Sequence, residues 1–133
     1  MKHPPTFLSV ADVLALYSDT LNKEGGLGGI RDLALLESAV MMPQQQFGGK
    51  FLHPEVFVMA AAYLYHIANN HPFADGNKRV AAMAAFVFLD VNGYDLIAAP
   101  EDFEDVVLRL AAGDLTKAEL AIWIKSNIRK SGM

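Results

Sequence analysis

Nine consecutive residues, from His71 to Arg79, carry the side-chain types that phosphoryl or nucleotidyl transfer requires; they read HPFADGNKR. Histidine titrates near neutral pH, so His71 can take a proton from an attacking hydroxyl group. Asp75 is a hard oxygen ligand, suited to a Mg²⁺ ion that also binds phosphate oxygens. We therefore predict that His71, Asp75 and Arg79 are catalytic, with Asp75 as the metal ligand.

The second half of this segment is suited to binding phosphate. Gly76 lets the backbone approach a ligand closely, and Asn77, Lys78 and Arg79 supply hydrogen-bond donors, two of them cationic. A helix is expected to begin here, so its free backbone N–H groups add an anion site. Phosphoryl transfer needs little beyond positioning and charge stabilisation. The four residues thus predict a nucleotide-binding site.

Hydrophobic periodicity and punctuation predict an all-α chain with no convincing strand. Six helices are expected, over about residues 9–23, 32–42, 54–70, 77–92, 100–113 and 116–130. The reactive segment connects the third helix to the fourth, which is apolar nearly all round and therefore predicted to be surrounded by other helices. Between the second and third helices, Gly48-Gly49 could form the tight turn of a short hairpin.

The composition fits one domain over residues 1–133, since 53% of the residues are hydrophobic and 20% are charged. Cysteine is absent, which excludes thiolate metal sites and suits a reducing cytoplasm. The formal net charge of −4 argues against direct nucleic-acid binding. The longest apolar stretch, Val80 to Leu89, is far shorter than the ~20 residues of a membrane span, and residues 1–8 do not resemble a signal peptide.

The reactive segment resembles the signature of the Fic family, H-P-F-x-[D/E]-G-N-x-R. It is most similar to the death-on-curing (Doc) branch, which reads H-x-F-x-D-[A/G]-N-K-R. The matching positions are His71, Phe73, Asp75, Asn77, Lys78 and Arg79. The helical layout, the chain length and the segments Gly25–Asp32 (GGLGGIRD) and Gln44–His53 are also similar to that family.

This resemblance implies a Fic-fold helical bundle and a role for each matching residue. His71 would deprotonate a hydroxyl on a target protein, and Asp75 would bind Mg²⁺. Phe73 would be a buried anchor for the segment. Gln44–His53 would be a flap that aligns a target peptide by main-chain pairing. The phosphate groups would be held by an anion hole of Gly76, Asn77 and Lys78, together with Arg79.

Two departures from the AMP-transferring pattern G-N-G-R-x-x-R imply a different reaction. Lys78 replaces the second glycine, and Ala82 stands where the second arginine would be. In the Doc branch ATP binds in reverse and presents its γ-phosphate. The resemblance therefore implies a kinase toxin that acts on a translation elongation factor. Transfer of AMP and a non-catalytic Fic-fold interaction module are the alternatives.

Two forms of restraint are open. Fic proteins often carry an inhibitory helix that reads [S/T]-x-x-x-E-[G/N], and the segment Thr20 to Gly25 (TLNKEG) fits these letters, although it ends a helix expected to be scaffold. The alternative, typical of the Doc branch, is an antitoxin whose disordered inhibitory tail folds on binding.

Other suggestive residues have plainer interpretations. His3, His53 and His66 are expected to be structural or merely exposed. The glycine run 25–29 lacks the Lys-Ser/Thr ending of a phosphate loop, so it predicts a helix terminator and a turn. Arg31 and Asp32 are expected to form a helix cap with a local ion pair, and Asp75 could be only an N-cap.

Overall fold

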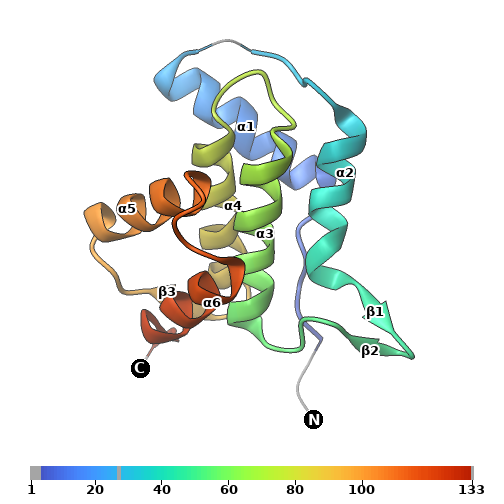
Figure 1. The fold of residues 1–133 in the computed structure, drawn as a ribbon, viewed down its shortest axis with the longest axis vertical. Coiled ribbons are helices and arrows are strands. Elements are labelled where there is room, and N and C mark those ends of the chain that lie inside the picture. The colour runs from blue at the N-terminus through green and yellow to red at the C-terminus, as the bar shows by residue number, and fades with distance from the viewer. Residues whose placement is uncertain (1–3, 27, 133) are drawn as a thin grey trace.

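A computed structural model describes residues 4–26 and 28–132, and these form six α-helices and two small sheets (Figure 1). The all-α prediction is confirmed, and each predicted helix boundary lies within two residues of the observed one, except the end of the last helix. A short 3₁₀ turn, η1 (Met42–Gln44), follows the second helix. The helices are α1 (Val10–Glu24), α2 (Leu33–Met41), α3 (Val56–Asn70), α4 (Asn77–Val91), α5 (Pro100–Ala111) and α6 (Lys117–Ser126).

Side-chain caps explain why α1 and α6 begin where they do. Ser9 accepts a hydrogen bond from the backbone N–H of Asp12 at 3.1 Å, and the Asp12 carboxylate accepts one from the backbone of Ser9 at 2.8 Å. Thr116 and Glu119 form the same reciprocal pair at the start of α6. Each pair satisfies two donors that the helix cannot satisfy itself. Both capping boxes form between residues only three positions apart in the chain.

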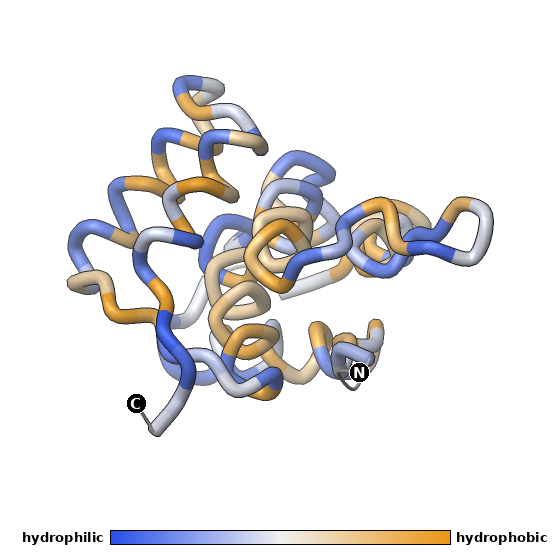
Figure 2. Tube along the Cα trace, turned by 90° about the horizontal axis from the view of Figure 1, so that it is seen from below, coloured by the Kyte–Doolittle hydropathy of each residue, from blue (hydrophilic) through white to orange (hydrophobic). Residues whose placement is uncertain are grey.

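The core forms around α3, which packs against α2, α4, α5 and α6, while α4 also packs against α1. Figure 2 shows hydrophobic and hydrophilic positions alternating along the helices, as expected where one face of each meets a core. α4 is less enclosed than predicted, because its neighbours leave Met83 and Phe86 exposed. None of the described helices is both long enough and apolar enough to cross a membrane.

The expected hairpin is present between α2 and α3. Strands β1 (Gln46–Phe47) and β2 (Lys50–Phe51) pair antiparallel around Gly48 and Gly49, which both have positive φ angles. Such a turn favours glycine because side chains disfavour that conformation. Figures 1 and 2 show this hairpin projecting from the helical body.

A second sheet corrects the prediction of no further strand. β3 (Tyr94–Leu96) pairs antiparallel with β4 (Ile128–Lys130), so that Leu96 lies opposite Ile128. Residues 128–130 had been predicted to continue the last helix, but α6 ends at Ser126. Their backbone groups instead find partners in a strand that is more than 30 positions earlier in the chain. Local periodicity carries no signal for such a pairing.

Candidate functional site

The reactive segment forms one wall of an open cleft with a volume of about 590 Å³, and α5 forms the other wall. This volume is typical of sites that bind small ligands. The structure brings the predicted residues to this one cleft, which is lined on the segment side by His71, Ala74, Asp75, Gly76, Asn77, Lys78 and Arg79. Phe73 is the exception, because its side chain is buried beneath the segment.

The start of α4 forms part of the cleft surface on the side of the reactive segment. Gly76 is the N-cap, with φ +79°, and no side chain caps the helix among the described residues. The backbone N–H groups of the first helical turn are therefore available to an anion, which the helix dipole also favours. Lys78 and Arg79 are exposed beside them. The arrangement is suited to holding phosphate groups.

Asp75 does not cap α4, so the plainer interpretation of this residue is wrong. Its Oδ1 atom accepts a hydrogen bond from the backbone N–H of Gly76 at 2.8 Å, and the side chain is exposed. The described residues contain no cluster of three or more His, Asp or Glu side chains that could hold a metal alone. A Mg²⁺ ion at Asp75 would therefore take most of its ligands from phosphate and water, which suits this ion.

Phe73 and Asn77 fix the shape of the segment. Phe73 is 1% exposed and stacks on Tyr17, with ring centroids 4.0 Å apart. The Asn77 side chain bonds to both backbone groups of Phe73, each at 3.0 Å. This amide is therefore a brace within the segment. In the predicted anion hole, Asn77 can therefore take part only through its backbone N–H.

His71 ends α3 in an unusual conformation. Its φ and ψ angles are 48° and 54°, and it is the only non-glycine residue with positive φ in the described part of the chain. A left-handed conformation costs an L-residue roughly 1–2 kcal/mol. Neighbouring contacts must hold the backbone there, and they do so in a way that leaves the imidazole exposed beside the cleft.

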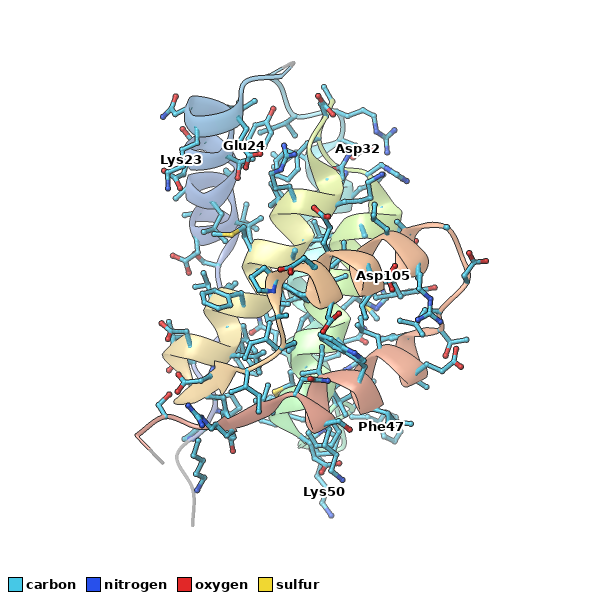
Figure 3. All side chains as sticks on the ribbon, turned by 90° about the vertical axis from the view of Figure 1, so that its left-hand side faces the viewer. Lys23, Glu24, Asp32, Phe47, Lys50 and Asp105 are labelled. Atoms are coloured by element: carbon cyan, nitrogen blue, oxygen red, sulfur yellow. The ribbon has the colours of Figure 1, made fainter. Side chains whose placement is uncertain are left out.

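A second segment, residues 24–26 and 28–32, runs antiparallel along the reactive segment, and we call it the strap. Its Gly29 carbonyl accepts a hydrogen bond from the Ala74 N–H at 3.0 Å, and Ile30 forms an isolated β-bridge with Phe73. The strap begins at α1 and ends at α2, and Figure 3 labels Glu24 and Asp32 at these two ends. Gly25 terminates α1 as predicted. The glycine run thus also supports the reactive segment from the side, although none of its described residues lines the cleft.

The strap approaches Asp75 closely at Gly26. A Cβ atom added there would lie 3.0 Å from the Oδ2 atom of Asp75, and the φ angle of Gly26 is +109°. Only glycine fits both the conformation and the space. The sequence identified this glycine as part of a turn but gave no sign of its neighbour.

The hairpin does not lie over the cleft, where the prediction of a flap placed it. It precedes α3, whereas His71 follows it, and a helix of 15 residues is about 22 Å long. Figure 3 shows Phe47 and Lys50 of the hairpin at the opposite end of the molecule from Glu24 and Asp32. The assignment of Gln44–His53 as a flap over the site is therefore wrong. The strap is the segment that runs beside the cleft.

Of the two residues of the possible inhibitory motif, only Glu24 reaches the candidate site. Glu24 forms an ion pair with Arg79, with 3.0 Å between Oε1 and Nε. The other motif residue, Thr20, is buried and donates its hydroxyl hydrogen to the Leu16 carbonyl within α1. Glu24 thus occupies the guanidinium group that was predicted to hold phosphate, whereas Thr20 has a structural role.

Arg31 is the residue that the sequence interpretation placed wrongly. Asp32 caps α2 as expected, by accepting a hydrogen bond from the Leu35 N–H at 3.1 Å. The Arg31 guanidinium does not pair with this carboxylate; it bonds to the backbone carbonyls of Asn70 and His71. These carbonyls are more than 35 positions away in the chain, and no local pattern indicates them.

His53 and His66 lie away from the cleft, as their structural interpretation requires. The Lys117 ammonium lies 3.2 Å from Nε2 of His53 and 2.9 Å from Nε2 of His66. Burial, and then the charge of Lys117, lowers the pKa of His66 to about 4 and also lowers that of His53. Both imidazoles are therefore neutral acceptors at pH 7. His3 falls outside the described residues.

Comparison with known proteins identifies the family of this chain. A family model described as "Fic/DOC family" matches residues 7–89, which include the strap and the reactive segment. The chain is 40% identical over 103 residues to "Toxin Doc" of Mycolicibacterium smegmatis, covering 73% of this chain and 79% of the relative. It is 29% identical over 114 residues to "Protein kinase doc" of Escherichia phage P1, covering 86% and 89% of the two chains. This chain therefore belongs to the Fic/DOC family.

Proposed function

We propose that this chain is a Doc-type toxin that transfers the γ-phosphate of ATP to a hydroxyl group on a target protein. The observation that carries the proposal is the convergence of His71, Asp75 and the uncapped start of α4 on one cleft. This reaction requires a general base, a metal ligand and an anion site that all face the same cleft.

The wall formed by α5 is suited to contacting the purine ring of the nucleotide. The residues of α5 that line the cleft recur at helical spacing on one face and are mostly apolar: Pro100, Phe103, Glu104, Val107, Leu108 and Ala111. Phe103 is supported from behind by Trp123, with parallel rings 6.0 Å apart. Leu108 is 49% exposed, so a bound purine would cover apolar surface that now faces water.

The triphosphate would then lie along the start of α4. The N–H groups of the first turn, together with Lys78 and Arg79, would hold its oxygens and neutralise charge as the transition state forms. Asp75 would hold Mg²⁺, which would bind phosphate oxygens and offset their charge. The imidazole of His71 would take the proton of the target hydroxyl. As that oxygen bonds to the γ-phosphorus, the bond to the β–γ bridging oxygen breaks and ADP leaves.

Two features support phosphate transfer over AMP transfer. Ala82 lines the cleft at the position where a second arginine would supply another phosphate clamp. Lys78, rather than glycine, lies in the anion site and would crowd the phosphates differently. The name of the phage relative, a protein kinase, points the same way. AMP transfer to a protein hydroxyl is the second candidate, and a non-catalytic interaction module is the third.

Supplying the purified protein with either α-³²P or γ-³²P ATP and Mg²⁺, in a lysate, tests this proposal, with His71→Ala as the control. We expect label to pass to one protein only from the γ position. Label passing only from the α position would establish AMP transfer. If neither label passes and His71→Ala arrests growth as strongly as the unaltered chain, the protein is a non-catalytic module.

The proposed biological setting is a toxin–antitoxin pair in the cytoplasm. The target would be a translation elongation factor, and phosphorylation would arrest growth. The name of the relative "Toxin Doc" supports an antitoxin partner. This antitoxin would restrain the toxin with a disordered inhibitory tail that folds on binding. Co-expression of the neighbouring open reading frame should relieve growth arrest, and deletion of its C-terminal tail should abolish that relief.

Glu24→Gln is expected to raise the affinity for ATP, because the ion pair with Glu24 competes with phosphate for Arg79. The pair is about half exposed, and such pairs contribute about 0–1 kcal/mol, so the gain should be at most about fivefold. Isothermal titration calorimetry at low salt measures it. Asp19→Asn, which breaks the exposed Lys23–Asp19 pair on the same helix, is the matched control. Equal or weaker binding by Glu24→Gln would show that the pair does not restrain the site.

A further inference from the structure

We infer that Arg31 is a positioning residue that sets the place of the His71 imidazole at the cleft; this inference rests on the proposed function. Arg31 does not line the cleft, and it reaches the site only through the backbone around His71. It would act on the reaction by orienting the base, without touching ATP or the target hydroxyl.

Three consecutive carbonyls converge on Arg31. Its Nε donates to the carbonyl of His71 at 2.6 Å, and its Nη2 donates to the carbonyl of Asn70 at 2.8 Å. Its backbone N–H donates to the carbonyl of Pro72 at 2.7 Å. The last carbonyls of a helix lack partners within it, and the planar guanidinium can bond to two of them at once. Arg31 therefore holds the chain immediately before, at and after His71.

The conformation of His71 explains why such a hold is needed. With φ at 48°, its backbone occupies a region that residues other than glycine rarely adopt. If the chain relaxed to an ordinary conformation, the Cα–Cβ bond and the imidazole would turn away from their present place beside the cleft. The Arg31 bonds fix both carbonyls that such a rotation would have to move.

The rest of the reactive segment has its own supports. Phe73 is buried against Tyr17, and the Asn77 side chain braces Phe73. Arg31 is exposed and contributes no apolar surface to the core. Its removal should therefore leave the fold and the phosphate site in place and affect mainly the orientation of His71.

Arg31→Ala and Arg31→Lys test the inference in the γ-phosphate transfer assay. We expect kcat of Arg31→Ala to fall about tenfold or more, because a displacement on the order of 1 Å can cost 10²-fold in rate. KM for ATP should stay within about twofold, since Arg31 does not line the cleft. Arg31→Lys should restore little, because one ammonium lacks the planar fork. Methylguanidinium at non-denaturing concentration should restore much of the rate of Arg31→Ala, since the site is open to solvent.

Arg129→Ala, which removes an exposed arginine from β4, is the control and should change neither parameter. An unchanged kcat for Arg31→Ala, or a loss that methylguanidinium does not reverse, would overturn the inference. If the unaltered protein transfers no label, the proposed function fails, and NMR then decides the inference separately. Arg31→Ala should shift the backbone amide and imidazole resonances of His71 while those of Trp123 stay in place. Unshifted His71 resonances would overturn it.

Discussion

His71→Ala is expected to lower the rate of γ-phosphate transfer by about 10²–10⁴-fold, the usual contribution of a general base. ATP affinity should change little, because the phosphate site is formed by the start of α4 and by Lys78 and Arg79. The two quantities are separated by measuring single-turnover transfer and calorimetric binding on the same preparations. A fall in affinity that accounts for the whole loss of rate would contradict the assignment of His71 as the base.

The left-handed backbone of His71 calls for a second variant. Alanine tolerates this conformation poorly, so a loss of rate in His71→Ala could arise from a displaced segment. Asparagine accepts this conformation more readily and has no basic nitrogen. His71→Asn should therefore keep the thermal stability of the unaltered chain, while its transfer rate should fall by the same factor as in His71→Ala. Retention of activity by His71→Asn would exclude a catalytic base at this position.

Phe73→Ala is expected to lower the free energy of unfolding by about 3–5 kcal/mol, as is typical when a buried phenylalanine is truncated. The ring is 1% exposed and stacked on Tyr17, and it lies where α1, the strap and the reactive segment meet. Total stability of such a chain is on the order of 5–15 kcal/mol, so the variant should be marginal. Urea denaturation followed by circular dichroism provides the measurement.

Phe47→Ala is the matched control for this prediction. Phe47 is 80% exposed on the hairpin, so its truncation should change stability by at most about 0.5 kcal/mol. Phe73→Leu keeps most of the apolar volume and should fold, while the looser segment should transfer phosphate more slowly. A loss below about 1 kcal/mol in Phe73→Ala would show that the ring is not the anchor of the segment.

The sequence by itself determined the features that depend on neighbouring residues. The helices follow from apolar periodicity, and their boundaries follow from local caps such as those at Ser9 and Thr116. The reactive segment is continuous in the chain, so its residue types pointed to the proposed chemistry before any fold was known. Phe73 is buried, as the family resemblance implied, and no described side chain caps the start of α4, as the predicted anion site required.

Tertiary structure alone decided which distant groups meet this segment. The strap places Glu24 on Arg79, Gly26 beside Asp75 and Arg31 on the carbonyls of Asn70 and His71. The same cause explains two wrong predictions. The second sheet was missed because β3 and β4 are far apart in the chain. The flap was misplaced because the hairpin lies at the far end of α3 from the reactive segment. A side chain's type fixes what it can bond to, but the partner is set by how the helices pack, and periodicity within one segment does not encode that packing.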